Sequence, residues 1–301
     1  MSKKSSIQYQ FMQSINKCFS PGDSKRSDRA NPLVDSHTKI YSYAARKELI
    51  TTAFDFAKFL KQEYQVKNLK EITPDMSQVF LDKKAATDEC KHITIKQYQS
   101  RLNKLEKVCS NHVRGSLNFM KGVRAPEYAD KSKKRDIVLH KNEYKMLCSI
   151  PTKSKAQLGL KLAYQFGLRE SELVKLKPFD IKSNVLRIVD SKGGKTREVP
   201  IVTKEQKKVL QEFKMECPNG LQMRTGSISK WMNRASKKLG LERINQSDSK
   251  IHAARKAYSQ REYLRLRQEG KTHKEAWGEV SENLGHGRDR MALFRVYNPE
   301  L

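Results

Sequence analysis

The side chains in the second half of the chain that could act on phosphate esters include Arg169, His252, Arg255 and Tyr297. Displacement at phosphorus needs a nucleophile, cations beside the non-bridging oxygens and groups that move protons. An arginine can donate two parallel hydrogen bonds to phosphate oxygens, a geometry that lysine cannot match. A tyrosine is a weak nucleophile with a pKa of ~10 and needs activation. A histidine, which titrates near ~6.5, is suited to taking its proton.

The spacing of these residues is more informative than their types. Arg169 lies in the segment G-L-R-E-S-E-L at an expected helix junction, and His252 and Arg255 are three positions apart on one face of an expected helix. A third segment, L-G-H, ends an expected helix on His286, and Tyr297 follows. A single exposed arginine is usually a solvated charge, and a single histidine is usually structural. All of these segments, in this order on one basic chain, are improbable by chance.

That order, G-L-R-x-S-E-L, a basic hairpin, H-x-x-R, L-G-H and a tyrosine, resembles the tyrosine recombinase (phage integrase) family. The resemblance covers the expected catalytic domain, and the helical region before it looks like the family's core-binding domain, with less specific motifs. It implies a site-specific DNA recombinase that cuts and rejoins strands through a 3′-phosphotyrosyl intermediate and integrates or excises a mobile genetic element. It also implies chemistry without a metal, a cofactor or ATP, and the chain has no P-loop signature.

The resemblance assigns roles to six residues. Tyr297, the only tyrosine after His286, matches the nucleophile, and His286 matches a histidine that supports the phosphate and the tyrosine. Lys192, on the expected hairpin, matches the lysine that protonates the leaving 5′-oxygen. Lys195 is its rival, and only the alignment of the Gly-Gly turn favours Lys192. The expected catalytic set is Arg169, Lys192, His252, Arg255, His286 and Tyr297.

Three other functions stay open. A resolvase of DNA multimers would use the same chemistry. A type IB topoisomerase-like enzyme would use it without joining two sites, but the helical region 38–122 favours a recombinase. A DNA-binding protein of this fold that no longer cuts is disfavoured because every expected catalytic position is filled. The recombinase interpretation implies double-stranded DNA as the substrate, a homotetramer on two DNA sites and accessory DNA-bending proteins as further candidate partners.

The charge of the chain agrees with a nucleic-acid partner. The 301 residues carry a formal net charge of +28, and Lys+Arg outnumber Asp+Glu by 61 to 33 along the whole sequence. So positive a surface is best neutralised by a polyanion, although a ribosomal or nucleoid protein would show the same balance. The five cysteines have no C-x-x-C spacing, so neither disulfides nor a zinc site are expected. With no long apolar run, the expected location is the cytoplasm, associated with the nucleoid when DNA is bound.

The elements that must position the candidate residues divide the chain into four parts. Residues 1–37 are polar and are expected to be an irregular extension. Residues 38–122 contain apolar stripes at helical spacing, whereas 123–136 are almost free of apolar residues and predict a linker. Residues 137–301 predict helices around a hairpin whose strands start near Val185 and Arg197. The expected fold is mixed and mainly α: an N-terminal all-helical core-binding (SAM-like) domain, then an α+β catalytic domain with a small antiparallel sheet.

Overall fold

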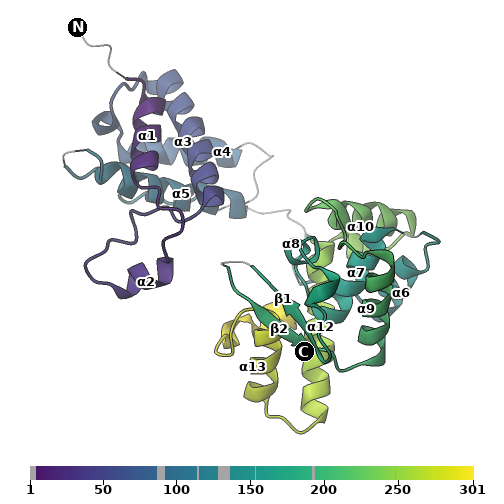
Figure 1. The fold of residues 1–301 in the computed structure, drawn as a ribbon. Helices are drawn as coiled ribbons and strands as arrows, with labels where there is room; N and C mark the ends of the chain where they lie inside the picture. The colour runs from purple at the N-terminus through teal and green to yellow at the C-terminus, as the bar shows by residue number, and fades with distance from the viewer. Residues whose placement is uncertain are drawn as a thin grey trace. The chain divides into compact units, whose positions relative to one another are not determined.

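The computed structural model describes residues 5–86, 92–113, 115–127, 136–152, 154–191, 194–247 and 249–301. They form two compact units, Met1–Ser132 and Lys133–Leu301, each with a hydrophobic core of its own (Figure 1). The predicted mainly helical fold with a small antiparallel sheet is confirmed. Among the described residues, no helix combines the length and apolar character that crossing a bilayer requires.

The first unit is a bundle of helices around stacked phenylalanines. Phe56 on the longest helix packs against Phe11, Phe80 and Phe119, with ring centroids 5.0–6.2 Å apart. The described elements of this unit are α1 (Ile7–Lys17), α2 (Lys25–Ala30), α3 (Tyr43–Tyr64), η1 (Leu69–Glu71), α4 (Pro74–Ala86) and α5 (His92–Ser110).

The expectation that residues 1–37 form an irregular polar extension is wrong. Ser6 caps α1 by accepting a hydrogen bond from the backbone N–H of Tyr9. Ile7, Phe11 and Ile15 recur every four residues, so they lie on one face of the helix, and all three are buried in the core of the first unit. Figure 1 shows α1 lying along α3. A short helix can pack with only three apolar positions. In the sequence these three residues lie among polar ones, so the segment was expected to be irregular.

The ends of the expected linker at 123–136 belong to the two units. Val123 is buried, and the backbone of Arg124 exchanges two hydrogen bonds with the side chain of Gln78. After the linker, Ile137, Val138 and Leu139 are buried in the core of the second unit. Residues 128–135, the middle of the expected linker, lie outside the described residues.

The second unit is built around α7 (Lys155–Phe166), which is buried on most sides between α9, α10 and α12. β1 (Val185–Ile188) and β2 (Arg197–Pro200) pair antiparallel, with Ile188 opposite Arg197, and β2 lies against α13. The sheet is the predicted hairpin, with strands that start at Val185 and Arg197. The other elements described here are α6 (Lys141–Cys148), α8 (Glu170–Leu173), η2 (Pro178–Asp180), α9 (Lys204–Glu216), α10 (Ser227–Lys238), α11 (Glu242–Asn245), α12 (Lys250–Gln268), α13 (His273–Asn283), η3 (Met291–Leu293) and α14 (Phe294–Tyr297).

Candidate active site

Four of the six predicted site residues meet at one point of the second unit. Arg169, Arg255 and Tyr297 all place a polar atom within 3.4 Å of Nε2 of His286. They come from the start of α8, the middle of α12 and the end of α14, and His286 follows α13. Segments that are far apart in the sequence therefore form a single cluster, and His286 is at its centre.

Arg169 is positioned by the turn that ends α7. Gly167 ends that helix in the left-handed region, at φ +64°, where a Cβ would lie 2.9 Å from the side chain of Leu284. Only glycine fits this close approach, so α8 can begin directly afterwards, with Arg169 as its N-cap. Arg169 Nη1 donates to Glu172 Oε1 at 2.8 Å, and Nη2 lies 3.4 Å from His286 Nε2. The side chain is 16% exposed, which leaves it accessible to a bound anion.

Arg255 is completely buried beneath the cluster. Its Nη1 donates to the carbonyl of Gly167 and its Nη2 to the carbonyl of Leu284, so it joins the ends of α7 and α13. Its Nε lies 3.4 Å from Tyr297 Oη. Burial lowers the pKa of Arg255 to about 10, which still leaves the guanidinium charged at neutral pH. Arg255 thus supplies a fixed positive charge beside the tyrosine oxygen.

His286 is held neutral by its surroundings. Burial, followed by the charges of Arg255 and Arg169, lowers its pKa to about 4. Two guanidinium groups and a hydroxyl converge on Nε2, and arginine can only donate, so Nε2 must carry the lone pair of the neutral ring. The Tyr297 hydroxyl can then donate to Nε2 across 2.8 Å. His286 is therefore placed to receive the proton of Tyr297.

Tyr297 is oriented by aromatic and polar neighbours. Trp277 packs near its ring at 6.4 Å, and the next residue, Asn298, accepts a hydrogen bond from the Ser259 hydroxyl at 2.9 Å. The two tyrosines of α12, Tyr258 and Tyr263, have other surroundings. Tyr258 is 2% exposed and burial raises its pKa, while the Tyr263 hydroxyl is 2.7 Å from His273 Nδ1.

Of the remaining two predicted residues, His252 is described by the structure and Lys192 is not. His252 is exposed on α12 and lines a cavity of about 320 Å³ together with Ser249, Lys256 and Tyr297. His252 therefore shares a cavity with the tyrosine. Lys192 lies outside the described residues, although Ser191 before it and Gly194 after it are joined by a turn hydrogen bond of 2.9 Å. Its rival, Lys195, is exposed, and its carbonyl accepts from the N–H of Ser191.

Two charged residues that the sequence reasoning did not single out support the cluster. Glu172 is nearly inaccessible and accepts from Arg169, from both terminal nitrogens of Arg197 and from the Ser191 hydroxyl. Burial alone would raise the pKa of Glu172, but Arg197 and Ser191 hold it well below its ordinary value. Glu172 was visible in the G-L-R-E-S-E-L segment, and Arg197 begins an expected strand. Only the fold shows that they meet.

The charge of the cluster suits an anionic ligand. Three guanidinium groups, those of Arg169, Arg197 and Arg255, lie within 4 Å of the single carboxylate of Glu172. One carboxylate cannot balance three cations, so the site is electropositive. Buried cations that are incompletely paired favour binding of an anion such as a phosphodiester, which would supply the missing charge.

Comparison with known proteins identifies the family. The model of the phage integrase family matches residues 138–297, which is more than half of the sequence, so the chain belongs to this family, that of the tyrosine recombinases. No curated protein sequence matches the chain.

Solved structures show the same fold. A lambda integrase tetramer bound to a Holliday junction matches with TM-score 0.69 and 19% identity, over 96% of this chain and 80% of that one. XerH site-specific recombinase on a palindromic difH substrate matches with TM-score 0.64 and 16% identity, over 99% and 94%. The Tn1549 transposon integrase, in complex with circular intermediate DNA, matches with TM-score 0.58 and 15% identity, over 96% and 94%.

Proposed function

We propose that this protein is a site-specific recombinase that cuts and rejoins double-stranded DNA through a 3′-phosphotyrosyl bond at Tyr297. The observation that carries the proposal is the convergence of Arg169, Arg255 and Tyr297 on the neutral imidazole of His286. The lambda integrase, XerH and Tn1549 integrase structures contain DNA, which supports DNA as the substrate. Within this function, integration or excision of a mobile genetic element is the role we favour, in agreement with the likeness to an integrase of a phage and to one of a transposon.

The positions of the atoms support the following cleavage step. Tyr297 Oη attacks the phosphorus and passes its proton to Nε2 of His286, 2.8 Å away. A new bond forms between this oxygen and phosphorus, and the bond between phosphorus and the 5′-oxygen breaks. The tyrosyl ester keeps the bond energy of the phosphodiester, so attack by a 5′-hydroxyl reverses the step without ATP. His252, which lines the same cavity as Tyr297, is a second candidate for proton handling.

The two arginines have different tasks in this mechanism. Arg169 is the more accessible, and we assign it to the non-bridging oxygens of the phosphate. Arg255 is buried and directed at Tyr297 Oη and two carbonyls, so it stabilises the negative charge that develops on the tyrosine oxygen as the proton leaves. Contact of Arg255 with the phosphate as well would require its 3.4 Å contacts to shift when DNA binds.

Protonation of the leaving oxygen is assigned to Lys192, with Lys195 as the alternative. This assignment rests on the family resemblance and on the position of both lysines in the sequence between β1 and β2. A substrate with sulfur in place of the 5′-oxygen tests it, because a thiolate leaves without needing a proton. We expect Lys192→Ala to slow cleavage of ordinary DNA and to cut the sulfur substrate at the native rate. If the sulfur substrate instead restored the native cleavage rate to Lys195→Ala, the protonation of the leaving oxygen would be reassigned to Lys195.

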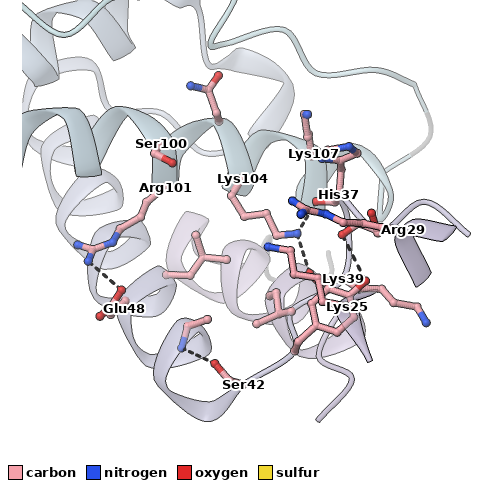
Figure 2. Close-up of a pocket in the computed structure, with 16 residues that line it drawn as sticks. Lys25, Arg29, His37, Lys39, Ser42, Glu48, Ser100, Arg101, Lys104 and Lys107 are labelled. Atoms are coloured by element: carbon pink, nitrogen blue, oxygen red, sulfur yellow. Dashed lines mark hydrogen bonds and ion pairs between the residues drawn. The ribbon is translucent and has the colours of Figure 1, made fainter. Parts of the chain in front are cut away.

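A basic pocket of the first unit is the proposed contact to the DNA backbone. Figure 2 shows this pocket, of about 540 Å³, between α5 and the segment that includes α2. Lys104 is half-buried and donates to the carbonyls of His37 and Lys39, which ties that segment to α5. Lys25, Arg29 and Lys107 line the same pocket and are exposed, so phosphate groups can reach them.

Recombination further requires two DNA sites and, we propose, four subunits, as in the lambda integrase tetramer. The test begins with selection of a target: a duplex with a randomised segment and a nick, incubated with the protein, from which covalently bound DNA is recovered. Supercoiled plasmids with one or two copies of the selected sequence are then compared. The proposal expects rearranged products only with two copies. Relaxation of any plasmid, independent of the sequence, would instead identify a topoisomerase.

A further inference from the structure

Arg197 makes four hydrogen bonds within the site, and the proposed cleavage step does not use it directly. Its Nη1 and Nη2 donate to the two oxygens of Glu172 at 2.8 and 2.9 Å, which is bidentate geometry. Its Nε donates to the carbonyl of Asn283 at 2.7 Å, and Nη1 also lies 3.3 Å from the Ser191 hydroxyl. The side chain is only 8% exposed.

These contacts join three segments of the site. Arg197 is the first residue of β2 and pairs with Ile188, so its backbone lies directly after the turn in which Lys192 is placed by sequence. Through Glu172 it reaches Arg169, and through Asn283 it holds the end of α13, three residues before His286. Gly285 lies against it: a Cβ there would be 3.3 Å from Arg197 Nη1 and 3.4 Å from Arg169 Nη1. The backbone before His286 thus packs directly on both guanidinium groups.

We propose that Arg197 is a positioning residue of the cleavage site, which fixes Arg169, His286 and the last strand pair before the hairpin turn relative to one another through Glu172 and Asn283. The inference rests on the proposed DNA cleavage. A direct contact of Arg197 with DNA is disfavoured, because its hydrogen bonds use four of the five N–H groups that a guanidinium offers. The expected effect is therefore on the rate of cleavage and not on DNA affinity.

The residue type matters because only arginine can make this set of contacts. Lysine in place of Arg197 keeps the charge but offers one point of contact, so it can pair with Glu172 or with the Asn283 carbonyl and not span both. Glutamine removes the charge and leaves the buried carboxylate with Arg169, Arg255 and the Ser191 hydroxyl as its neighbours. Displacement of reacting groups by about 1 Å costs on the order of 100-fold in rate.

The test measures formation of the covalent adduct with a nicked duplex that native protein has captured from a randomised library. We expect Arg197→Gln to form the adduct about 100-fold more slowly, and Arg197→Lys to be intermediate. Dissociation constants for the same duplex, and their dependence on salt, should match the native values for both variants. The matched control is Arg265→Gln, because Arg265 makes a bidentate pair with Glu262 away from the site and should change neither quantity.

A double substitution shows whether Arg197 acts through Glu172. If it does, Glu172→Gln combined with Arg197→Gln should be about as slow as the slower single variant, whereas independent effects would multiply. Arg197→Lys keeps the experiment decisive should the glutamine variant unfold. Native adduct rates in both Arg197 variants, multiplied effects in the double variant, or a salt slope lowered by about one in Arg197→Gln would each overturn the inference. Failure of the native protein to form any adduct would instead overturn the proposed function.

Discussion

Replacement of Arg255 by alanine should affect the stability of the second unit as well as catalysis. The guanidinium satisfies the carbonyls of Gly167 and Leu284, and the side chain is completely buried. A buried acceptor left without a partner costs about 1–3 kcal/mol, so Arg255→Ala should lower the free energy of unfolding by about 2–6 kcal/mol. That loss is a large part of the ~5–15 kcal/mol by which a typical domain is stable.

Urea unfolding followed by tryptophan fluorescence measures this effect in the relevant unit. Both tryptophans of the chain, Trp231 and Trp277, belong to the second unit. With a urea dependence of about 2 kcal/mol per molar, the midpoint of Arg255→Ala should fall by about 1–3 M. Arg261→Ala is the control, because Arg261 lies on the same helix and donates to one carbonyl, that of Tyr164, without contacting the site.

The rate of DNA cleavage should distinguish the variants of Arg169 and Arg255 from the control variant, Arg261→Ala. Arg169→Ala leaves both carbonyls bonded to Arg255, so its midpoint should stay closer to native than that of Arg255→Ala. Adduct formation should nevertheless fall by about 10²–10³ in both variants, as is typical on loss of a preorganised donor, and stay native in Arg261→Ala. An unchanged urea midpoint in Arg255→Ala would refute the reasoning, because the two carbonyl contacts would then contribute nothing.

Three further predictions concern DNA binding, metals and pH. Lys25→Ala and Lys107→Ala should each reduce by about one the slope of log affinity against log salt, which Lys70→Ala, outside the basic pocket, should leave unchanged. Adduct formation should be equal in excess EDTA and in added Mg²⁺, and loss of the adduct in EDTA would contradict the metal-free mechanism. Because the pKa of His286 is lowered to about 4, its acceptor nitrogen is free above that pH and is lost as the pH falls through it. The His286-dependent fall in cleavage should thus occur near pH 4, and a fall centred at the ordinary histidine pKa of ~6.5 would contradict this assignment.

The sequence predicts those parts of the fold whose signals are local. The two predicted strands pair antiparallel, and the expected helices surround them. Helix α1 was missed because its stripe of three apolar residues lies among polar ones, and only the bundle shows what the stripe packs against. A local pattern shows that a segment can form a helix, but not whether a partner for it exists elsewhere in the chain.

The candidate site was predictable as a set of residues but not as an arrangement. The order of motifs brings Arg169, Arg255, His286 and Tyr297 into one hypothesis, and the fold brings them together. The order of motifs does not show that Arg255 is buried beneath the tyrosine, because burial of this arginine depends on carbonyls at the ends of two other helices. Glu172 and Arg197 escaped for the same reason: an ion pair between a helix and a strand 25 residues later has no signature in spacing.

The central claim is that Tyr297 is the nucleophile, and one measurement tests it most directly. Native protein and Tyr297→Phe are incubated with a nicked duplex selected by covalent capture, denatured and separated by size, with Tyr263→Phe as the control because the Tyr263 hydroxyl contacts His273 away from the site. The substitution in Tyr297→Phe removes one oxygen, so folding and DNA affinity should be retained. Native protein and Tyr263→Phe should give an adduct on the 3′ side of the break that survives denaturation, and Tyr297→Phe should give none. An adduct with Tyr297→Phe would show that the nucleophile is another residue.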